Sequence, residues 1–436
     1  MIAAILAGGK GTRLGDRAGG LPKPLVPLAG KSVLEFQMES LKRSGIRKIL
    51  LLTGYKGEVI RDRFKEGAQM GVSIDYFSEK EPLGTGGAVK QACSSLKEPF
   101  LVLYGDCMID MDFVRMTDFH AAKAGIATLA VHPNSHPFDS DLLDMDDHDR
   151  IVGFYAKPHD IGGYRRNLVN AGAYILSPEL LADIPEGFSD FGKDIFPAIL
   201  RSGKRMYGYS TSEYIKDMGT VERLASVERD TVAGKPIARN LSHPQRAIFL
   251  DRDGVINEEV DLIRRAEDLR LLPGAAGAIK QINGSIFLGI VVTNQPAVAR
   301  GLCSLDEVQR MHKRIDTLLG GEGAFIDQYY VCPHHPDRGF PEENPAFKIP
   351  CDCRKPSIGM IRAATRKFNI DTGRSYIIGD STRDIQTGRN AGLFTILVKT
   401  GYGGTDKTFA ADPDYCAPDL AAAVDYILNN DPAGKR

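Results

Sequence analysis

The residues best suited to chemistry in this sequence form three groups, and the first is a set of cysteines and histidines in the proline-rich segment VCPHHPDRGFPEENPAFKIPCDCRKP. Cys332 and His334 form one close pair, and Cys351 and Cys353 form another after sixteen intervening residues. Two such pairs give four soft ligands tetrahedral placement, and a Cys3His set suits a structural Zn²⁺ site. His335 is the alternative histidine, and free thiols or a disulfide are the alternatives to a metal.

The second group consists of carboxylates and their neighbours in the second half of the chain. Asp251 and Asp253 lie two residues apart in FLDRDGVIN, directly after an apolar run. Such a pair, with Mg²⁺, can divide the roles of nucleophile and general acid or base. Later apolar runs end at or near Thr293, Asn294, Asp380 and Asp384, and Lys355 lies between them in CRKP.

The third group is a glycine-rich segment, LAGGKGTRLGDRAGGLPKPLVPL, which follows the first apolar run of the chain. Gly8, Gly9 and Gly11 let backbone amides approach phosphate oxygens, and Arg13 and Lys23 supply positive charge for a triphosphate. The segment fits neither the dinucleotide-binding pattern nor the Walker pattern, so a tight structural turn is the alternative.

Two more segments of the first half point to phosphate chemistry. EPLGTGGAVKQA is a second glycine-rich turn that opens a helix, and LVLYGD places Asp106 at the end of a buried strand. A carboxylate in that place is a good ligand for Mg²⁺.

Strands that alternate with helices must position these groups. The apolar runs 2–7, 48–54, 100–106 and 127–132 predict buried strands, and residues 32–45 predict an amphipathic helix that ends at Gly45. The alternation predicts an α/β fold with a parallel sheet in the first half. It begins again in the second half, where the expected strands are 247–254, 285–294, 375–380 and 394–401.

Length and pattern together predict two large α/β domains. A segment with prolines, small residues and charges suggests a linker at 233–245, between domains at 1–232 and 246–436. Each domain starts with a strand that runs directly into a polar turn.

Composition narrows the class of protein. The 436 residues are 43% hydrophobic and 25% charged with a net charge of -1, which gives no general attraction to nucleic acid or to a membrane. The N-terminus lacks the features of a secretory or membrane-spanning segment, and an odd number of cysteines argues against a disulfide framework. We therefore expect a cytoplasmic protein with small-molecule partners, while the sequence gives no oligomeric state.

The first half resembles the sugar-phosphate nucleotidyltransferases, the enzymes that make NDP-sugars. The resemblance covers about residues 1–230 and rests on GGKGTRL, PKPLVPL, EPLGTGG, LYGD, FYAKP, LVNAGAY and KDMGT in this order. It implies that Asp106 and Asp217 bind Mg²⁺ and that Lys23 lies near the reacting phosphates. The nucleotide phosphates would contact Gly8, Gly9, Gly11, Thr12 and Arg13.

The same resemblance assigns the rest of the first site. The base would contact the turn formed by Leu83, Gly84, Thr85, Gly86 and Gly87. Lys157 and Asn170 would hold the sugar 1-phosphate. Many relatives have glutamate before the lysine, where this chain has Ala156, which leaves part of the sugar recognition open. The sugar phosphate itself attacks the α-phosphorus of the NTP, so positioning and charge neutralisation are the main tasks of the protein.

The second half resembles the haloacid dehalogenase phosphatases from about residue 246 to 430. The resemblance implies that Asp251 attacks phosphorus to form an aspartyl phosphate, while Asp253 protonates the leaving oxygen and then activates water. Thr293 and Asn294 would cradle the phosphate, and Lys355 would offset negative charge. The Mg²⁺ ligands would be Asp251, Asp380 and the carbonyl group of Asp253. Asp384 would support the metal site or cap the following helix.

The spacing of these elements leaves no room for a full cap domain, so we expect a capless phosphatase with a zinc loop beside its site. CPHHP and CDCRKP, with FLDRDGVIN, resemble the D,D-heptose 1,7-bisphosphate phosphatases, and the histidinol-phosphate phosphatases are close relatives. Arg300 and Arg354 would hold a second phosphate or hydroxyls, with solvent exposure as the alternative for Arg300. Pro296 and Ala297 depart from the usual TNQSGI sequence and leave the loop shape open.

Three hypotheses follow for the whole chain. In the first, the phosphatase makes heptose 1-phosphate from the bisphosphate, and the transferase, resembling the heptose 1-phosphate guanylyltransferases, converts it to GDP-heptose for a surface glycan. In the second, both chemistries act on other substrates, such as another hexose 1-phosphate and histidinol phosphate. In the third, the first half only senses a nucleotide sugar. The presence of Arg13, Lys23, Asp106 and Asp217 together argues against the third.

Overall fold

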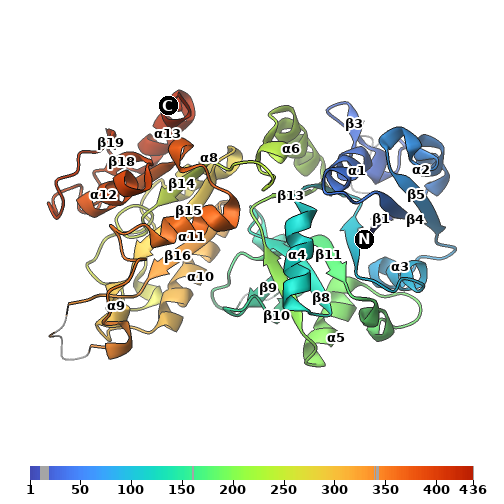
Figure 1. Cartoon of the computed structure of the whole chain (residues 1–436), viewed down its shortest axis with the longest axis horizontal. Coiled ribbons are helices and arrows are strands. Elements are labelled where there is room, and N and C mark those ends of the chain that lie inside the picture. The colour runs from blue at the N-terminus through green and yellow to red at the C-terminus, as the bar shows by residue number, and fades with distance from the viewer. Residues whose placement is uncertain (10–18, 160–161, 338, 340–342, 436) are drawn as a thin grey trace. The chain divides into compact units, whose positions relative to one another are not determined.

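The computed structural model describes residues 1–9, 19–159, 162–337, 339 and 343–435. These residues divide into two compact units, each shown by its ribbon in Figure 1. The first unit holds residues 1–132, 139–159 and 168–242, and the second holds 133–138, 160–167 and 243–436. The main division falls between Ser242 and His243, inside the segment expected to be a linker.

Most of that segment is a packed part of the first unit rather than a loose connector. Lys235–Ala238 form the short helix α7. Asn240 is buried, and its side-chain amide donates to Asp110 Oδ1 at 2.7 Å. Prolines and small residues suggested an irregular segment, but buried hydrogen bonds hold it in place.

The large sheet of the first unit is mixed, so the expectation of a parallel sheet was wrong in part. Its order is β10-β9-β11-β6-β1-β4-β5, with β8 beside β11 and β12 beside β8. The strands β6, β1, β4 and β5 are parallel, whereas β11 runs antiparallel to β6 and β8. The strands are β1 (Ile2–Ala7), β4 (Lys48–Thr53), β5 (Ser73–Ser78), β6 (Phe100–Tyr104), β8 (Ala127–His132), β9 (Leu142–Met145), β10 (Ile151–Tyr155), β11 (Val169–Leu176) and β12 (Met206–Ser210).

One antiparallel pair, β9 with β10, follows from a short connection. Only residues 146–150 join β9 to β10, and a link of that length cannot make the crossover that a parallel pair needs. Two smaller ribbons complete the strands of this unit. They pair β2 (Pro27–Leu28) with β3 (Lys31–Ser32) and β7 (Cys107–Asp110) with β13 (Tyr214–Asp217).

Helices cover both faces of this sheet and bury its apolar side chains. One core packs α1 (Val33–Arg43), α2 (Gly57–Phe64) and α4 (Phe113–Lys123) on the strands. The opposite core contains α3 (Gly84–Cys93) and α5 (Phe196–Arg201). A smaller cluster includes α6 (Val221–Val232) and residues of β13. The helix expected at 32–45 is α1, where Ser32 caps the first turn in a capping box with Glu35.

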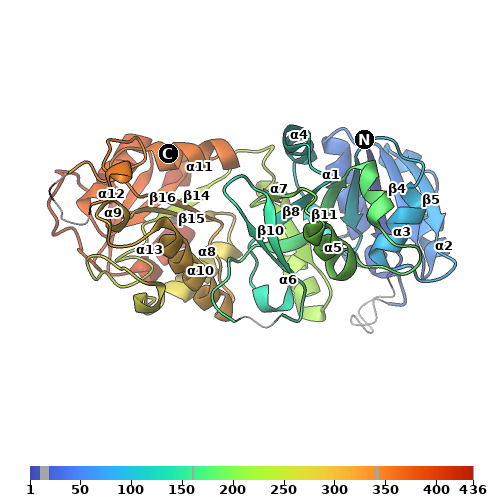
Figure 2. The same cartoon turned by 90° about the horizontal axis from the view of Figure 1, so that it is seen from below.

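The second unit contains a parallel six-stranded sheet in the order β16-β15-β14-β17-β18-β19. Figure 2 shows α11 and α12 on one side of the strands and α8, α10 and α13 on the other. The strands are β14 (Ala247–Leu250), β15 (Leu288–Asn294), β16 (Gln328–Cys332), β17 (Tyr376–Gly379), β18 (Phe394–Val398) and β19 (Tyr415–Ala417). The helices are α8 (Ala275–Gly284), α9 (Pro296–Ala299), α10 (Leu305–Gly321), α11 (Gly359–Phe368), α12 (Thr382–Ala391) and α13 (Leu420–Asn430).

Two short segments from the first half of the sequence fold as part of the second unit, which no pattern in the sequence predicted. They are residues 133–138 and 160–167. Arg166 Nε donates to Asp316 Oδ2 on α10 at 2.8 Å, and Arg314 of the same helix donates to the Tyr164 hydroxyl.

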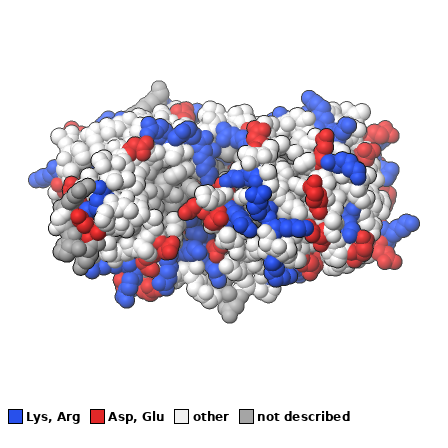
Figure 3. Space-filling view, turned by 60° about the horizontal axis from the view of Figure 1, so that its bottom comes forward, with Lys and Arg blue, Asp and Glu red and all other residues white. Residues whose placement is uncertain are grey.

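The surface carries both signs of charge. On the face drawn in Figure 3, acidic and basic side chains are interspersed, as a net charge of -1 would suggest. Among the described residues, no helix has the length and apolar character needed to cross a membrane.

Candidate active sites and metal cluster

The first candidate site lies at the carboxyl ends of the parallel strands of the first unit. Gly8 follows β1, Gly54 follows β4, and Asp106 follows β6 by two residues. The backbone segments at Gly8 and Gly54 come so close together that a Cβ added at Gly8 would lie 3.3 Å from Gly54 N. Open α/β sheets bind their ligands at this edge, so the glycine-rich segment begins where a nucleotide is expected. Gly9 is described, whereas Gly11, Thr12 and Arg13 lie outside the described residues.

Lys23 brings the two expected Mg²⁺ ligands of this site together. Its ammonium lies 2.7 Å from Asp106 Oδ2 and 3.5 Å from Asp217 Oδ1. The β7–β13 ribbon explains the arrangement, because its register places Asp217 opposite Cys107, the residue after Asp106. Burial disfavours the ammonium, yet the two carboxylates raise the pKa of Lys23 above its ordinary value.

A chain of ion pairs continues from this centre to the residues expected to hold the sugar phosphate. Arg223 bonds to Asp217 Oδ2 at 2.7 Å and to Asp139 Oδ2 at 2.6 Å. Lys157 Nζ donates to the carbonyl oxygen of Asp139 at 3.0 Å. Burial opposes ionisation of Asp217, but Lys23 and Arg223 lower its pKa. The alternating charges fix the carboxylates without leaving either sign in excess.

The turn expected to contact the base begins α3 and is tightly packed. Gly84 has φ +69°, and a Cβ there would meet Ser189 O at 2.4 Å, so only glycine fits without strain. Thr85 Oγ1 donates to Asp190 Oδ2 at 3.0 Å and accepts from Phe191 N at 2.9 Å. The Thr85 side chain therefore helps to hold this turn against residues 189–191.

The second candidate site lies at the carboxyl ends of β14, β15 and β17. Asp251 follows the central strand, and its neighbours in register end near Asn294 and Asp380. Lys355 Nζ lies 2.9 Å from Asp251 Oδ2 and 2.6 Å from Asp384 Oδ1. Asp251, Asp380 and Asp384 each offer an oxygen to one cluster within 4.8 Å.

Electrostatics show that this cluster has a deficit of positive charge. Burial and then repulsion from Asp384 raise the pKa of Asp251 to about 7, and burial and Asp251 raise that of Asp380 to about 8. Burial disfavours the charge on Lys355, but Asp251 and Asp384 raise its pKa. Two buried carboxylates and one partly buried carboxylate around one ammonium are suited to hold a divalent cation with oxygen ligands.

Asp384 caps a helix, which is one of the two roles that the sequence suggested, and it also lies in the carboxylate cluster. Its Oδ2 accepts hydrogen bonds from Ser381 N and Ser381 Oγ, which caps the first turn of α12. Its Oδ1 pairs with Lys355, so it also belongs to the charged cluster.

Asp253 is held by two side chains that were not among the site residues expected from the sequence. The guanidinium of Arg252, which is fully buried, contacts both carboxylate oxygens of Asp253, with Nη2 at 2.8 and 2.9 Å. Gln295 Nε2 donates to Asp253 Oδ2 and to Thr293 Oγ1, each at 2.8 Å. The arginine between the two aspartates of FLDRDG could have indicated this contact, because a buried arginine is rarely found without a partner.

The side chain of Asn294 pairs with the backbone of Lys355 in this structure. Its Oδ1 accepts from Lys355 N at 3.0 Å, and its Nδ2 donates to Lys355 O at 3.3 Å. This pairing orients Lys355 across 61 residues of sequence, so the structure gives the Asn294 side chain a positioning contact. Thr293 is buried, and its hydroxyl lies beside Gln295.

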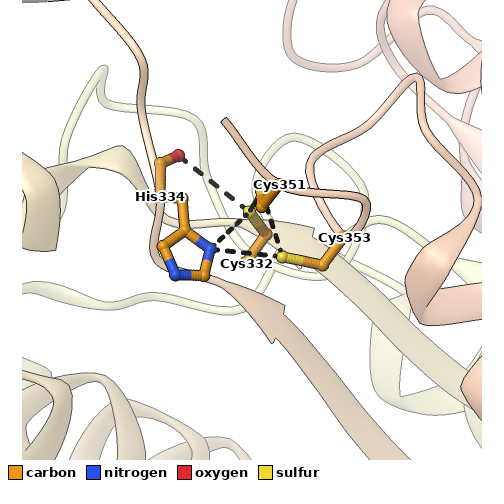
Figure 4. Close-up of side chains that lie close together, drawn as sticks. All are labelled: Cys332, His334, Cys351 and Cys353. Atoms are coloured by element: carbon orange, nitrogen blue, oxygen red, sulfur yellow. Dashed lines mark hydrogen bonds between the residues drawn. The ribbon is translucent and has the colours of Figure 1, made fainter. Parts of the chain in front are cut away.

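The four expected soft ligands converge, as Figure 4 shows. Cys332 Sγ lies 3.5 Å from Cys351 Sγ, and Cys353 Sγ lies 3.3 Å from Cys351 Sγ and 3.3 Å from His334 Nδ1. A tetrahedral centre with bonds of about 2.3 Å to sulfur separates its ligands by about 3.8 Å, so the set fits a metal ion with a small adjustment. The seven cysteines form no disulfide.

The cluster is tied to the second site through neighbouring residues. His334 is the histidine in the cluster, while His335 Nδ1 accepts from Asp337 N instead. Arg354 Nη1 donates to His334 O at 3.1 Å. Burial, followed by the charge of Arg354, lowers the pKa of His335 to about 4. Pro296 and Ala297 begin the short helix α9.

Comparisons with known proteins cover both halves. The nucleotidyl transferase family model matches residues 2–233, and the HAD-hydrolase-like model matches residues 352–423. A D-glycero-D-manno-heptose-1,7-bisphosphate 7-phosphatase of Thermosynechococcus vestitus is 41% identical over 194 residues, which are 43% of this chain and 97% of that protein.

The guanylyltransferase relative of the first half is longer than the region that it shares with this chain. A mannose-1-phosphate guanylyltransferase of Mycobacterium tuberculosis is 33% identical over 235 residues, 53% of this chain, and the match spans 65% of that protein. Among solved structures, HddC from Yersinia pseudotuberculosis matches 53% of this chain and 99% of its own, with 28% identity and a TM-score of 0.46.

Proposed function

Because the chain belongs to the nucleotidyl transferase family through residues 2–233 and, through its second half, to the heptose-bisphosphate 7-phosphatase family, we propose that it catalyses two consecutive steps toward a nucleotide-activated heptose. Residues 246–436 remove the 7-phosphate of D-glycero-D-manno-heptose 1,7-bisphosphate. Residues 1–232 then transfer a nucleotidyl group, GMP from GTP, to heptose 1-phosphate and release pyrophosphate. The steps are compatible because a phosphatase that spares C1 leaves the phosphate that the transferase needs.

The observation that carries this proposal is the presence of two separate carboxylate and lysine centres in one chain. Lys23 joins Asp106 to Asp217, and Lys355 joins Asp251 to Asp384. Each centre lies at the carboxyl ends of parallel strands, the usual position of α/β active sites.

In the phosphatase, Asp251 attacks the 7-phosphorus and forms an aspartyl phosphate. Asp253 gives its proton to the departing C7 oxygen and later takes a proton from the attacking water. Arg252 and Gln295 hold Asp253 in place, and Lys355 offsets the charge on the nucleophile and the phosphoryl group. Asp251, Asp380 and the carbonyl of Asp253 would hold Mg²⁺, which supplies further charge neutralisation when bound.

In the transferase, an oxygen of the sugar 1-phosphate attacks the α-phosphorus of GTP, and pyrophosphate leaves in line. Lys23 lies beside the carboxylates that would hold Mg²⁺, Asp106 and Asp217, and can shift its ammonium to the phosphates when the metal occupies them. The protein contributes orientation and fixed charge rather than a nucleophile.

The Cys332, His334, Cys351 and Cys353 cluster would bind Zn²⁺ as a structural ion. Four protein ligands leave no open position for water, which favours a structural role over a catalytic one. Cys353 lies two residues before Lys355, so a metal that fixes this loop also fixes the approach of Lys355 to Asp251.

Separate inactivation of the two centres tests the proposal. Asp106→Asn should abolish pyrophosphate release and leave phosphate release intact, and Asp251→Asn should do the reverse. Purified protein is given heptose 1,7-bisphosphate with each NTP in turn, and both products are followed. Phosphate release from heptose 1-phosphate at the rate seen with the bisphosphate would contradict the consecutive steps.

The same assay separates the proposed substrates from their alternatives. Mannose 1-phosphate serves as a competing acceptor, because a relative of the first half is named a mannose-1-phosphate guanylyltransferase. Histidinol phosphate serves as a competing phosphatase substrate. A higher kcat/KM for either compound than for its heptose counterpart would change the substrate and leave both reaction types in place.

A further inference from the structure

Asp141 connects the two residues expected to hold the sugar 1-phosphate in the first unit. It lies just before β9, and its Oδ1 accepts a hydrogen bond from Lys157 N at 3.0 Å. Its own carbonyl oxygen accepts from Asn170 N at 2.9 Å. The carboxylate is thus held at the corner where Lys157 and Asn170 meet, and its position depends on the backbone of both.

The second oxygen of this carboxylate takes no part in the hydrogen bonds from Lys157 N and Asn170 N. Among the residues that the structure describes, no donor bonds to Asp141 Oδ2. It faces Gly192, where an added Cβ would come within 2.6 Å of it. Because Gly192 has no side chain, the carboxylate of Asp141 can occupy the space beside it.

A second polar atom beside Asp141 also lacks a partner. Asn170 Oδ1 is buried and, within the described part of the chain, accepts no hydrogen bond. Burying an acceptor without a donor costs about 1–3 kcal/mol, so an O–H group of a ligand is the natural partner here. Within the described residues no donor meets hydrogen-bond geometry with either acceptor, although the Tyr174 hydroxyl lies near Asn170. Two such acceptors suit a ligand with several hydroxyl groups.

The sequence around Lys157 supports a role for the carboxylate of Asp141 in this corner. Ala156 stands where many nucleotidyltransferases have a glutamate, so the segment FYAKP has no carboxylate of its own. Asp141 bonds to the N–H of the very next residue, Lys157, and so presents a carboxylate to the same part of the unit from a neighbouring strand.

We propose that Asp141 is a specificity-determining residue of the transferase, and that its Oδ2 accepts hydrogen bonds from ring hydroxyls of the sugar 1-phosphate while Asn170 Oδ1 accepts from another. This inference rests on the proposed function of the first unit. Hydrogen bonds from hydroxyls to an ionised carboxylate are stronger than neutral ones, so the contact favours sugars whose hydroxyls reach both acceptors.

A purely structural role for Asp141 makes a different prediction. If it only braces the backbone of Lys157, an asparagine would serve equally well, because Asn Oδ1 accepts the same N–H. Asp141→Asn keeps that bond and replaces the free Oδ2 by an amide that donates. The variant therefore separates hydroxyl recognition from bracing without removing the side chain.

The test measures steady-state transfer from GTP to heptose 1-phosphate by the full chain, with pyrophosphate as the readout. Asp141→Asn should raise KM for the sugar phosphate about 10- to 100-fold, with KM for GTP and phosphate release from the bisphosphate unchanged. Mono-deoxy analogues of the sugar 1-phosphate identify the hydroxyl, because for one of them wild type and Asp141→Asn should have equal kcat/KM.

A double variant tests the inference in the opposite direction, by restoring what Asp141→Asn removes. Asp141→Asn with Ala156→Glu returns a carboxylate to the corner from the adjacent residue and should recover at least part of the lost kcat/KM. An unchanged KM for the sugar phosphate in Asp141→Asn, or a loss equal for every deoxy analogue, would overturn the inference. If wild type transfers no nucleotide to any sugar 1-phosphate, the proposed function fails instead.

Discussion

Glu213 provides a sharp test of the electrostatics of the first unit. The side chain is buried at 3% exposure, and its carboxylate accepts from Asp112 N at 2.6 Å, Leu241 N at 3.0 Å and Thr211 Oγ1 at 2.9 Å. Burial nevertheless dominates these hydrogen bonds and raises the pKa of Glu213 from 4.5 to about 7. Glu213→Gln retains the shape and an oxygen for both backbone donors, and its amide can donate to Thr211.

The sign of the effect follows from which state binds the proton. Below pH 4.5 both folded and unfolded chains hold the Glu213 proton, so ionisation contributes nothing. Between pH 4.5 and 7 the unfolded chain loses the proton first, and the folded state is destabilised as pH rises. With 1.36 kcal/mol per unit, a shift from 4.5 to about 7 corresponds to about 3 kcal/mol, fully developed above pH 7.

The assay is urea unfolding followed by a brief protease pulse, with peptides from residues 1–132 and 168–242 quantified by mass spectrometry. This reports the first unit separately, since a two-unit chain need not unfold in one step. The free energy of unfolding of Glu213→Gln, relative to wild type, should rise by about 3 kcal/mol from pH 4.5 to 8. Glu98→Gln, at an exposed position, is the control and should give no such slope. Parallel pH profiles for Glu213→Gln and wild type would refute the reasoning.

Two further predictions concern the second unit. Lys355→Met leaves Asp251 and Asp384 without their shared ammonium, so phosphate release should be lost and the unfolding free energy of residues 243–436 should fall by about 3–5 kcal/mol, measured by the same protease pulse. Normal stability would show that the ion pairs are not what holds this centre. Cys351→Ser should lower zinc content, measured by elemental mass spectrometry, and phosphatase turnover together while nucleotidyl transfer persists. Full turnover in zinc-free protein would contradict the structural role of the cluster.

The sequence predicted the core strands correctly for a physical reason, although two of them end earlier than expected, at Leu250 and at Val398. Continuous apolar runs such as Ile2–Ala7 and Ala247–Leu250 must be buried on both faces of a sheet, and the polar residue after each run then lies at the sheet edge. The positions of Asp106 and Asp251 followed from this rule. Cys332 and Cys351 each have a second possible metal ligand two residues later, and that short spacing was enough to suggest a metal site.

The partners of those residues were not predictable in the same way. Asn294 pairs with the backbone of Lys355 across 61 residues, and Arg223 joins Asp217 to Asp139 across 84 residues. Such pairs depend on the register of strands and on helix placement, which composition and spacing do not encode. The antiparallel direction of β11 was missed for the same reason, since a buried apolar strand looks alike in either direction.

The inclusion of residues 133–138 and 160–167 in the second unit has a consequence for how such a chain can be recombined. Cutting between residues 242 and 243 separates the sequence into halves but leaves Asp316 without Arg166 and Arg314 without Tyr164. A chimera that joins the first half of one fused chain to the second half of a related chain should therefore fold only when the two residues of each contact pair are matched. Across homologous fusions, the identities at 164 and 314, and at 166 and 316, should vary jointly, whereas stand-alone phosphatases should show no such linkage at the positions matching 314 and 316.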